Sequence, residues 1–105
     1  MNERFPDEWT QEEFLREKAR LEANGVKVLL VDTILQPIEH IETITYNPPL
    51  LHREPDGTVL VFYCDSGKDT LARLPEYRRR FPDKHCISLR GGRGYWNKYR
   101  SEATC

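Results

Sequence analysis

The sequence predicts a single α/β domain, a small doubly wound sheet of mostly parallel strands with helices on both faces. The first observation behind this prediction is length, because 105 residues is a common size for one domain. The second is that strand-like apolar runs alternate with helix-compatible segments, a pattern typical of parallel sheets covered by helices. The third is the unbroken apolar run Val59–Tyr63, which is typical of a strand buried on both faces.

Composition indicates a soluble globular protein, with 38% apolar and 31% charged residues. No apolar run approaches the roughly 20 residues that a transmembrane helix needs, and residues 1–8 contain no apolar signal core. We therefore expect a cytoplasmic protein with no membrane partner.

The net charge of −1 is unevenly distributed along the chain. Residues 1–57 carry 6 Lys and Arg against 12 Asp and Glu, whereas residues 58–105 carry 10 against 5. The basic half contains the cysteine loop described below, and its charge suits a small anionic substrate. It lacks the interleaved aromatic and basic motif of known nucleic-acid readers, so we expect no nucleic-acid partner.

The N-terminal region predicts an arm followed by a helix. Residues 1–9 are expected to form a loosely held arm. Thr10 and Glu13 have the spacing of a capping box, which predicts a helix over residues 10–23. The pair Asn24-Gly25 is expected to end this helix, because glycine tolerates the positive φ of a helix C-terminus.

Residues 26–57 are predicted to contain two strands, and the segments between and after them show little pattern of secondary structure. The run 26–32 is rich in β-branched residues and predicts a strand with Asp32 at its carboxyl end. Residues 33–40 carry no clear pattern, and residues 41–46 predict a short strand. Residues 50–57 are expected to form a connection that ends in a turn.

After the central strand, the chain predicts helices around one more strand. A helix over 70–81 is expected to be interrupted at Pro75, because proline disrupts a helix interior. Residues 85–89 predict a strand, 93–100 a final helix, and 101–105 a mobile tail. The buried side of the interrupted helix is expected to contain Leu71, Leu74, Tyr77 and Phe81.

A cysteine follows the central strand and is the candidate chemical centre. Cys64 enters a short loop containing Gly67, and loop amides near a helix start favour a thiolate. In a parallel sheet the carboxyl ends of the strands share one edge, where ligands bind. We therefore expect Asp32, the loop 64–69 and the turn 90–92 to converge there.

Four segments match the pattern of a known family. They are Val28-Leu29-Leu30-Val31-Asp32, Glu39-His40-Ile41, Tyr63-Cys64-Asp65-Ser66-Gly67-Lys68-Asp69-Thr70, and Leu89-Arg90-Gly91-Gly92-Arg93-Gly94-Tyr95-Trp96. Through these segments the chain resembles the rhodanese-like single-domain sulfurtransferases over about residues 10–100.

The resemblance implies a rhodanese-like fold and a sulfurtransferase of the thiosulfate type that needs no cofactor. Cys64 would take a sulfane sulfur from thiosulfate or a protein persulfide, become a persulfide, and pass the sulfur to a thiophilic acceptor such as a thiol. The implied substrate-binding residues are Asp65, Ser66, Gly67, Lys68, Asp69 and Thr70, with Asp32, His40 and Arg90 in support.

The residue types in the loop suit these roles on physical grounds. Gly67 permits backbone angles that a side chain forbids, and the Ser66 hydroxyl is able to donate a hydrogen bond to sulfur. Lys68 is the cation of the loop and is expected to attract an anionic donor. Thr70 is expected to cap the following helix.

Two acidic residues in the loop oppose a simple thiosulfate activity. Many members of the family carry arginines at the positions of Asp65 and Asp69, and carboxylates there would raise the thiol pKa and repel thiosulfate. We therefore expect a working enzyme that uses thiosulfate poorly and prefers a protein persulfide. The alternative is a catalytically weak or inactive rhodanese-like module that binds a protein partner through the same edge.

A cysteine phosphatase or arsenate reductase is a third hypothesis. Those enzymes need a Cys-x5-Arg loop to hold a tetrahedral oxyanion. Here Thr70 stands at the arginine position and the first arginine after the cysteine is Arg73, which argues against this class.

The remaining cysteines and histidines predict no metal site, because they are scattered without ligand spacing. Cys86 is expected in the core, Cys105 in an inert exposed position, and Trp96 in the core rather than against a cofactor. The physiological donor and acceptor and the oligomeric state stay open.

Overall fold

The computed structural model describes residues 5–96, and its centre is one five-stranded sheet. All strand pairs are parallel, and the spatial order is β1-β5-β4-β2-β3. The strands are β1 (Glu8–Trp9), β2 (Val28–Asp32), β3 (Ile44–Thr45), β4 (Val59–Tyr63) and β5 (His85–Leu89). The predicted α/β fold is confirmed, and it is consistent with a rhodanese-like doubly wound sheet.

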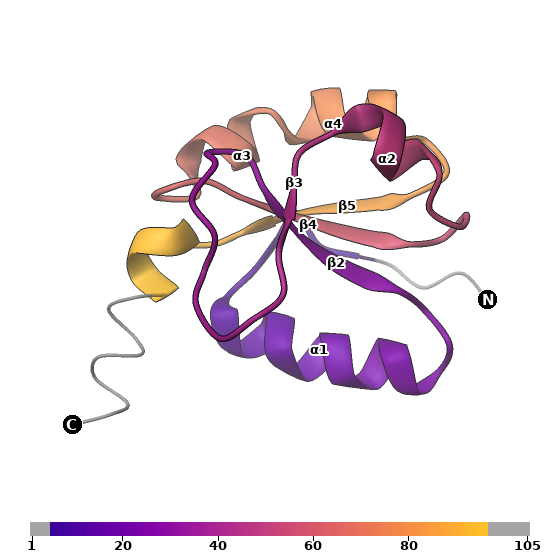
Figure 1. The fold of residues 1–105 in the computed structure, drawn as a ribbon, viewed down its shortest axis with the longest axis horizontal. Helices are drawn as coiled ribbons and strands as arrows, with labels where there is room; N and C mark the ends of the chain where they lie inside the picture. The colour runs from indigo at the N-terminus through magenta and orange to yellow at the C-terminus, as the bar shows by residue number, and fades with distance from the viewer. Residues whose placement is uncertain (1–4, 97–105) are drawn as a thin grey trace.

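Helices cover both faces of the sheet (Figure 1). One face carries α1 (Gln11–Ala23), and the other carries α2 (Pro48–His52), α3 (Lys68–Ala72) and α4 (Leu74–Arg80). Residues 92–96 are also helical. Within the described residues, no helix is long and apolar enough to cross a membrane.

The alternation of side chains along β4 builds two cores. Val59, Val61 and Tyr63 belong to the core under α1, together with Phe14 and Trp96. Leu60 and Phe62 point the other way and pack with residues of α2 and α4. Every residue of β4 has 0% exposed surface, so the prediction of a strand buried on both faces is confirmed.

Several local predictions are confirmed by their hydrogen bonds. The Glu13 N–H donates to Thr10 Oγ1 at 3.1 Å and the Thr10 N–H donates to Glu13 Oε1 at 2.9 Å, which completes the capping box of α1. Gly25, just after the helix, has φ +81°. Trp96 is buried at 4% exposure in a T-shaped ring contact with Phe14, as expected of a core residue.

Other predictions need correction. Glu8 and Trp9 were expected in the arm, but they pair with Ser88 and Leu89 of β5 and form an edge strand. The connection expected at 50–57 overlaps helix α2, because Asn47 caps it and proline is tolerated in a first helical turn. The strand expected at 41–46 is limited to the two residues of β3.

The helix expected at 70–81 is divided near Pro75, as predicted, but its first part begins earlier. The start of α3 is Lys68 rather than Thr70, and α4 starts at Leu74. Leu71 is exposed rather than buried, whereas the other three predicted core residues of this segment are buried. Residues 97–105, with the end of the expected last helix, the tail and Cys105, lie outside the described part.

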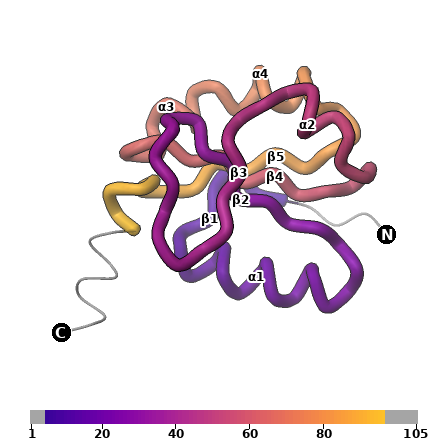
Figure 2. Tube along the Cα trace, viewed as in Figure 1, coloured from indigo at the N-terminus to yellow at the C-terminus, as the bar shows by residue number. Residues whose placement is uncertain are grey.

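The longest connection in the described chain runs between β2 and β3. Figure 2 shows that it leaves the carboxyl end of β2 and loops outward before it returns to the sheet edge, and its first residues, Thr33 and Ile34, share a pocket with residues of α3. The Thr33 N–H donates to Tyr63 O at 3.2 Å, which fixes the start of this connection against the end of β4. The connection therefore reaches the neighbourhood of Cys64.

Candidate functional site

Cys64 lies directly after β4, the central strand of the sheet, with β5 and β2 on either side. Its side chain is 3% exposed. The Gly67 N–H donates to Cys64 Sγ at 3.1 Å, and Thr70 Oγ1 lies 3.7 Å from the same sulfur. The sulfur is thus surrounded by hydrogen-bond donors of its own loop.

These donors favour the charged form of the thiol. Burial raises the pKa of Cys64, but hydrogen bonds from the backbone and hydroxyl of Thr70 and from the amides of Gly67 and Ser66 outweigh it. The net result is a pKa below the ordinary value for cysteine. A larger fraction of the sulfur is therefore thiolate, the form that acts as a nucleophile.

Thr70 reaches the sulfur because it does not cap the helix. The N-cap of α3 is Gly67, with φ +87°, and the cap makes no side-chain hydrogen bond. Thr70 is buried in the first turn, where Thr70 Oγ1 lies 2.8 Å from Ser88 Oγ of β5. The expectation that Thr70 caps α3 is wrong, and its hydroxyl instead connects the sulfur to β5.

The turn at Gly91-Gly92 packs closely against the backbone of the cysteine loop. The Arg93 N–H donates to Cys64 O at 2.8 Å, and the Gly94 N–H donates to Asp65 O at 2.9 Å. A Cβ on Gly92 would collide with Cys64 O, so this close approach requires glycine. The two motifs that the sequence placed at the same edge are therefore in direct contact.

A pocket of about 120 Å³ opens beside the sulfur. It is lined by Thr33, Ile34, Cys64, Asp69, Thr70, Arg73 and Tyr77. The sequence interpretation missed Thr33, Ile34, Arg73 and Tyr77. Arg73 had a usable signal, because it follows Asp69 at i+4 and such residues share one face of a helix.

The pocket walls combine two opposite charges with a neutral phenol. Asp69 and Arg73 form no ion pair with each other in the described part of the chain, although the Arg73 N–H donates to Asp69 O at 2.9 Å. Burial, followed by the nearby Tyr46, raises the pKa of Tyr77. The Tyr77 phenol therefore stays protonated near neutral pH and is available as a donor.

The exposed residues of the loop contribute less to the pocket. Asp65, Ser66 and Lys68 are exposed and do not line it. The Lys68 N–H donates to Ser66 Oγ at 3.3 Å, so the hydroxyl acts as an acceptor there, while the Ser66 amide faces the sulfur.

The three supporting residues lie in different settings. Asp32 is buried at 1% exposure and its Oδ1 accepts the Ile34 N–H at 2.8 Å, which holds a pocket wall in place. Arg90 is exposed, and its backbone N–H donates to Trp9 O at 2.8 Å. His40 is exposed, lies 4.0 Å from the Glu39 carboxylate, and does not line the pocket.

The described residues contain no group of three or more His, Cys, Asp and Glu side chains that could hold a metal ion. Cys86 is 2% exposed in the core under α4, as expected. Burial raises the pKa of Cys86 to about 11, so this thiol stays neutral at physiological pH.

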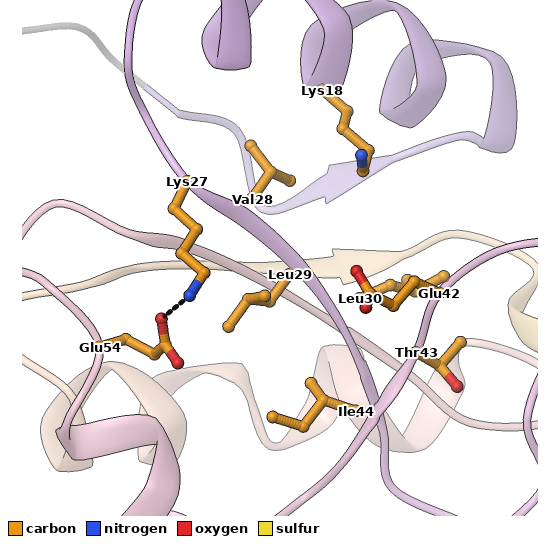
Figure 3. Close-up of a pocket in the computed structure, with 9 residues that line it drawn as sticks. All are labelled: Lys18, Lys27, Val28, Leu29, Leu30, Glu42, Thr43, Ile44 and Glu54. Atoms are coloured by element: carbon orange, nitrogen blue, oxygen red, sulfur yellow. Dashed lines mark ion pairs between the residues drawn. The ribbon is translucent and has the colours of Figure 1, made fainter.

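A second pocket, of about 340 Å³, lies between α1, β2 and residues 42–44 (Figure 3). Lys27 Nζ and Glu54 Oε1 form an ion pair at 2.5 Å on one side of it. Its lining residues include neither cysteine nor histidine and share no member with the pocket at Cys64. It therefore offers no thiol to a sulfur donor.

The chain was compared with protein-family models, with curated proteins and with solved structures, and none of the three comparisons gives a significant match.

Proposed function

We propose that the protein is a rhodanese-like sulfurtransferase that carries sulfane sulfur on Cys64. The observation that supports this most is the setting of Cys64 Sγ. It accepts the Gly67 N–H at 3.1 Å, its pKa is lowered, and it lines a pocket of about 120 Å³. A nucleophile in contact with a small cavity is what a sulfur-accepting centre requires.

In the first half-reaction the Cys64 thiolate attacks the outer sulfur of the donor. A new S–S bond forms to Cys64 Sγ while the donor's own bond to that sulfur breaks. The electron pair of the broken bond leaves with the donor, as sulfite from thiosulfate or as a thiolate from a persulfide. Cys64 then carries the transferred sulfur as a persulfide.

In the second half-reaction an acceptor thiolate or cyanide attacks the outer sulfur of the Cys64 persulfide. The S–S bond to Cys64 breaks, and its electron pair returns to Sγ as the thiolate. The Gly67 amide and the Thr70 hydroxyl stabilise that anion in the free enzyme. The cycle starts from a free thiol, which suits the reducing conditions of the cytoplasm.

The test combines a thiosulfate:cyanide assay with mass spectrometry of the protein after incubation with a sulfur donor. We expect the mass of one added sulfur on Cys64, lost in Cys64→Ser and retained in the matched core variant Cys86→Ala. If Cys64→Ser forms thiocyanate as fast as the wild type, the enzyme proposal is wrong.

The second candidate is a rhodanese-like module that binds a protein partner and has little or no catalysis. The exposed carboxylates of the loop favour it, above all Asp69, which lines the pocket, because they oppose the binding of an anionic donor. The absence of any added sulfur from thiosulfate and from persulfide donors would support this candidate over the enzyme.

A further inference from the structure

We propose that the pocket at Cys64 selects a small zwitterionic persulfide, the persulfide of an α-amino thiol such as cysteine, with Asp69 binding its ammonium and Arg73 its carboxylate. This inference rests on the proposed sulfurtransferase function and names the donor class for that site.

The pocket at Cys64 carries one negative and one positive side chain, which favours a zwitterionic ligand. Within residues 5–96, Asp69 and Arg73 are the charged side chains that line the pocket. They lie at i and i+4, with Asp69 in the first turn of α3 and Arg73 at its C-cap, and both are exposed. They are not paired with each other among the described residues, so both are available to a ligand.

A zwitterionic ligand is able to pair with both charged side chains of the pocket, whereas a dianion is able to pair only with Arg73. The Asp69 carboxylate repels thiosulfate while the Arg73 guanidinium attracts it, so the two charges act against each other on a dianion. An α-amino acid presents an ammonium and a carboxylate on one carbon atom. The guanidinium is able to bind the carboxylate through two parallel hydrogen bonds, which fixes the orientation of the donor.

The size of the pocket limits how much of the donor enters. Its volume of about 120 Å³ is slightly below the ~150 Å³ of a cavity that holds benzene. The persulfide end and the adjoining carbon of a cysteine persulfide therefore fit beside Cys64, and the charged end remains at the exposed side chains. Most of a larger thiol would have to stay outside.

The transfer is balanced without a further reactant. The Cys64 thiolate attacks the outer sulfur of R–S–SH, and the S–S bond of the donor breaks. The electron pair leaves on the inner sulfur as R–S⁻, and the proton stays on the transferred sulfur. The products are the Cys64 persulfide and free cysteine thiolate.

The test measures the initial rate of persulfide formation on Cys64 with three donors at equal concentration. The donors are cysteine persulfide, N-acetylcysteine persulfide, which lacks the ammonium, and cysteamine persulfide, which lacks the carboxylate. Each is tested on the wild type, on Asp69→Asn and on Arg73→Gln. Glu76→Gln and Arg79→Gln, exposed changes on α4 outside the pocket lining, are the matched controls.

We expect cysteine persulfide to react fastest. Asp69→Asn should slow cysteine and cysteamine persulfides about fivefold but not the N-acetyl donor, on the scale of an exposed charge pair. Arg73→Gln should slow the cysteine and N-acetyl donors but not cysteamine persulfide, and the control variants should match the wild type.

Equal rates for the three donors, or variant effects that ignore which charge the donor carries, would overturn the zwitterion proposal and leave the sulfurtransferase proposal intact. If no donor adds sulfur to Cys64, the sulfurtransferase proposal fails and this inference fails with it.

Discussion

Cys64, directly after β4, and Cys86, within β5, are two thiols with almost no exposed surface, 3% and 2%. Cys86 belongs to the apolar core cluster on the α4 side of the sheet, and burial raises its pKa to about 11. Cys64 follows β4 and enters a loop whose amides and hydroxyl point at the sulfur, and its pKa is lowered. Low exposure alone therefore does not decide thiol reactivity, because hydrogen-bond donors outweigh burial at Cys64, whereas burial is the largest influence on the pKa of Cys86.

The largest predicted effect comes from removing the glycine that holds the Cys64 loop. Gly92→Ala places a methyl group against Cys64 O at a residue with φ +59°. We expect about 3 kcal/mol of destabilisation and a loss of Cys64 reactivity, measured by chemical denaturation and by alkylation.

The matched control for that prediction is Gly25→Ala. Gly25 also has positive φ, at +81°, but a Cβ there meets nothing within 4 Å. It should cost only about 1 kcal/mol and leave the alkylation rate of Cys64 unchanged. Equal effects of the two variants would contradict the close approach of the glycine turn to the loop.

The second-largest predicted effect comes from removing the Thr70 hydroxyl, which lies beside the Cys64 sulfur. Thr70→Val keeps the shape of the side chain but removes the group that contacts both Cys64 Sγ and Ser88 Oγ. We expect the pKa of Cys64 to rise, its alkylation at neutral pH to slow several-fold, and stability to fall by about 1–2 kcal/mol.

Thr58→Val provides the control, since this buried hydroxyl donates to Pro55 O and is remote from the thiol. It should lower stability by a similar amount without changing the pH profile of Cys64. A shifted profile in Thr58→Val would show that the Thr70 effect is a general loss of stability.

The smallest predicted effect is a loss of folding stability at alkaline pH, caused by ionisation of the buried Cys86 thiol. The folded pKa of Cys86, about 11, lies above its ordinary value of 9.0, so its contribution to stability is complete below pH 9 and is lost as pH rises toward 11. At pH 10 the wild type should lose about 1 kcal/mol that Cys86→Ala does not lose. Denaturation curves of both proteins from pH 7 to 10.5 measure this, and parallel losses would contradict the burial of a neutral thiol.

The central strands were predictable because their signals are local. The run Val59–Tyr63 is apolar throughout, and β2 is apolar up to its terminal Asp32, whereas β5 mixes polar and apolar residues and has a weaker signal. The strand Glu8–Trp9 was not predictable, because two residues are too few to show the alternation of polar and apolar side chains typical of a strand. Its strand conformation depends on pairing with β5. Helix α2 was missed because its five residues are too few to show a helical period and begin with two prolines, although both prolines fit a first helical turn.

The candidate site was predictable only where its residues are contiguous. Cys64 and Gly67 stand in one short motif, whereas Arg73 and Tyr77 reach the pocket through the break between α3 and α4. Thr33 and Ile34 come from another strand end, so their position depends on sheet order. His40 was selected by motif likeness alone and lies exposed, outside the pocket lining.

The most direct test of the claim that Cys64 is an activated thiol is the pH dependence of its alkylation, followed at each cysteine by mass spectrometry. We predict a midpoint for Cys64 below the ordinary cysteine value of 9.0, with Cys86 unreactive until well above it. A Cys64 midpoint at or above 9.0 would contradict the account, because the loop donors would then fail to outweigh burial.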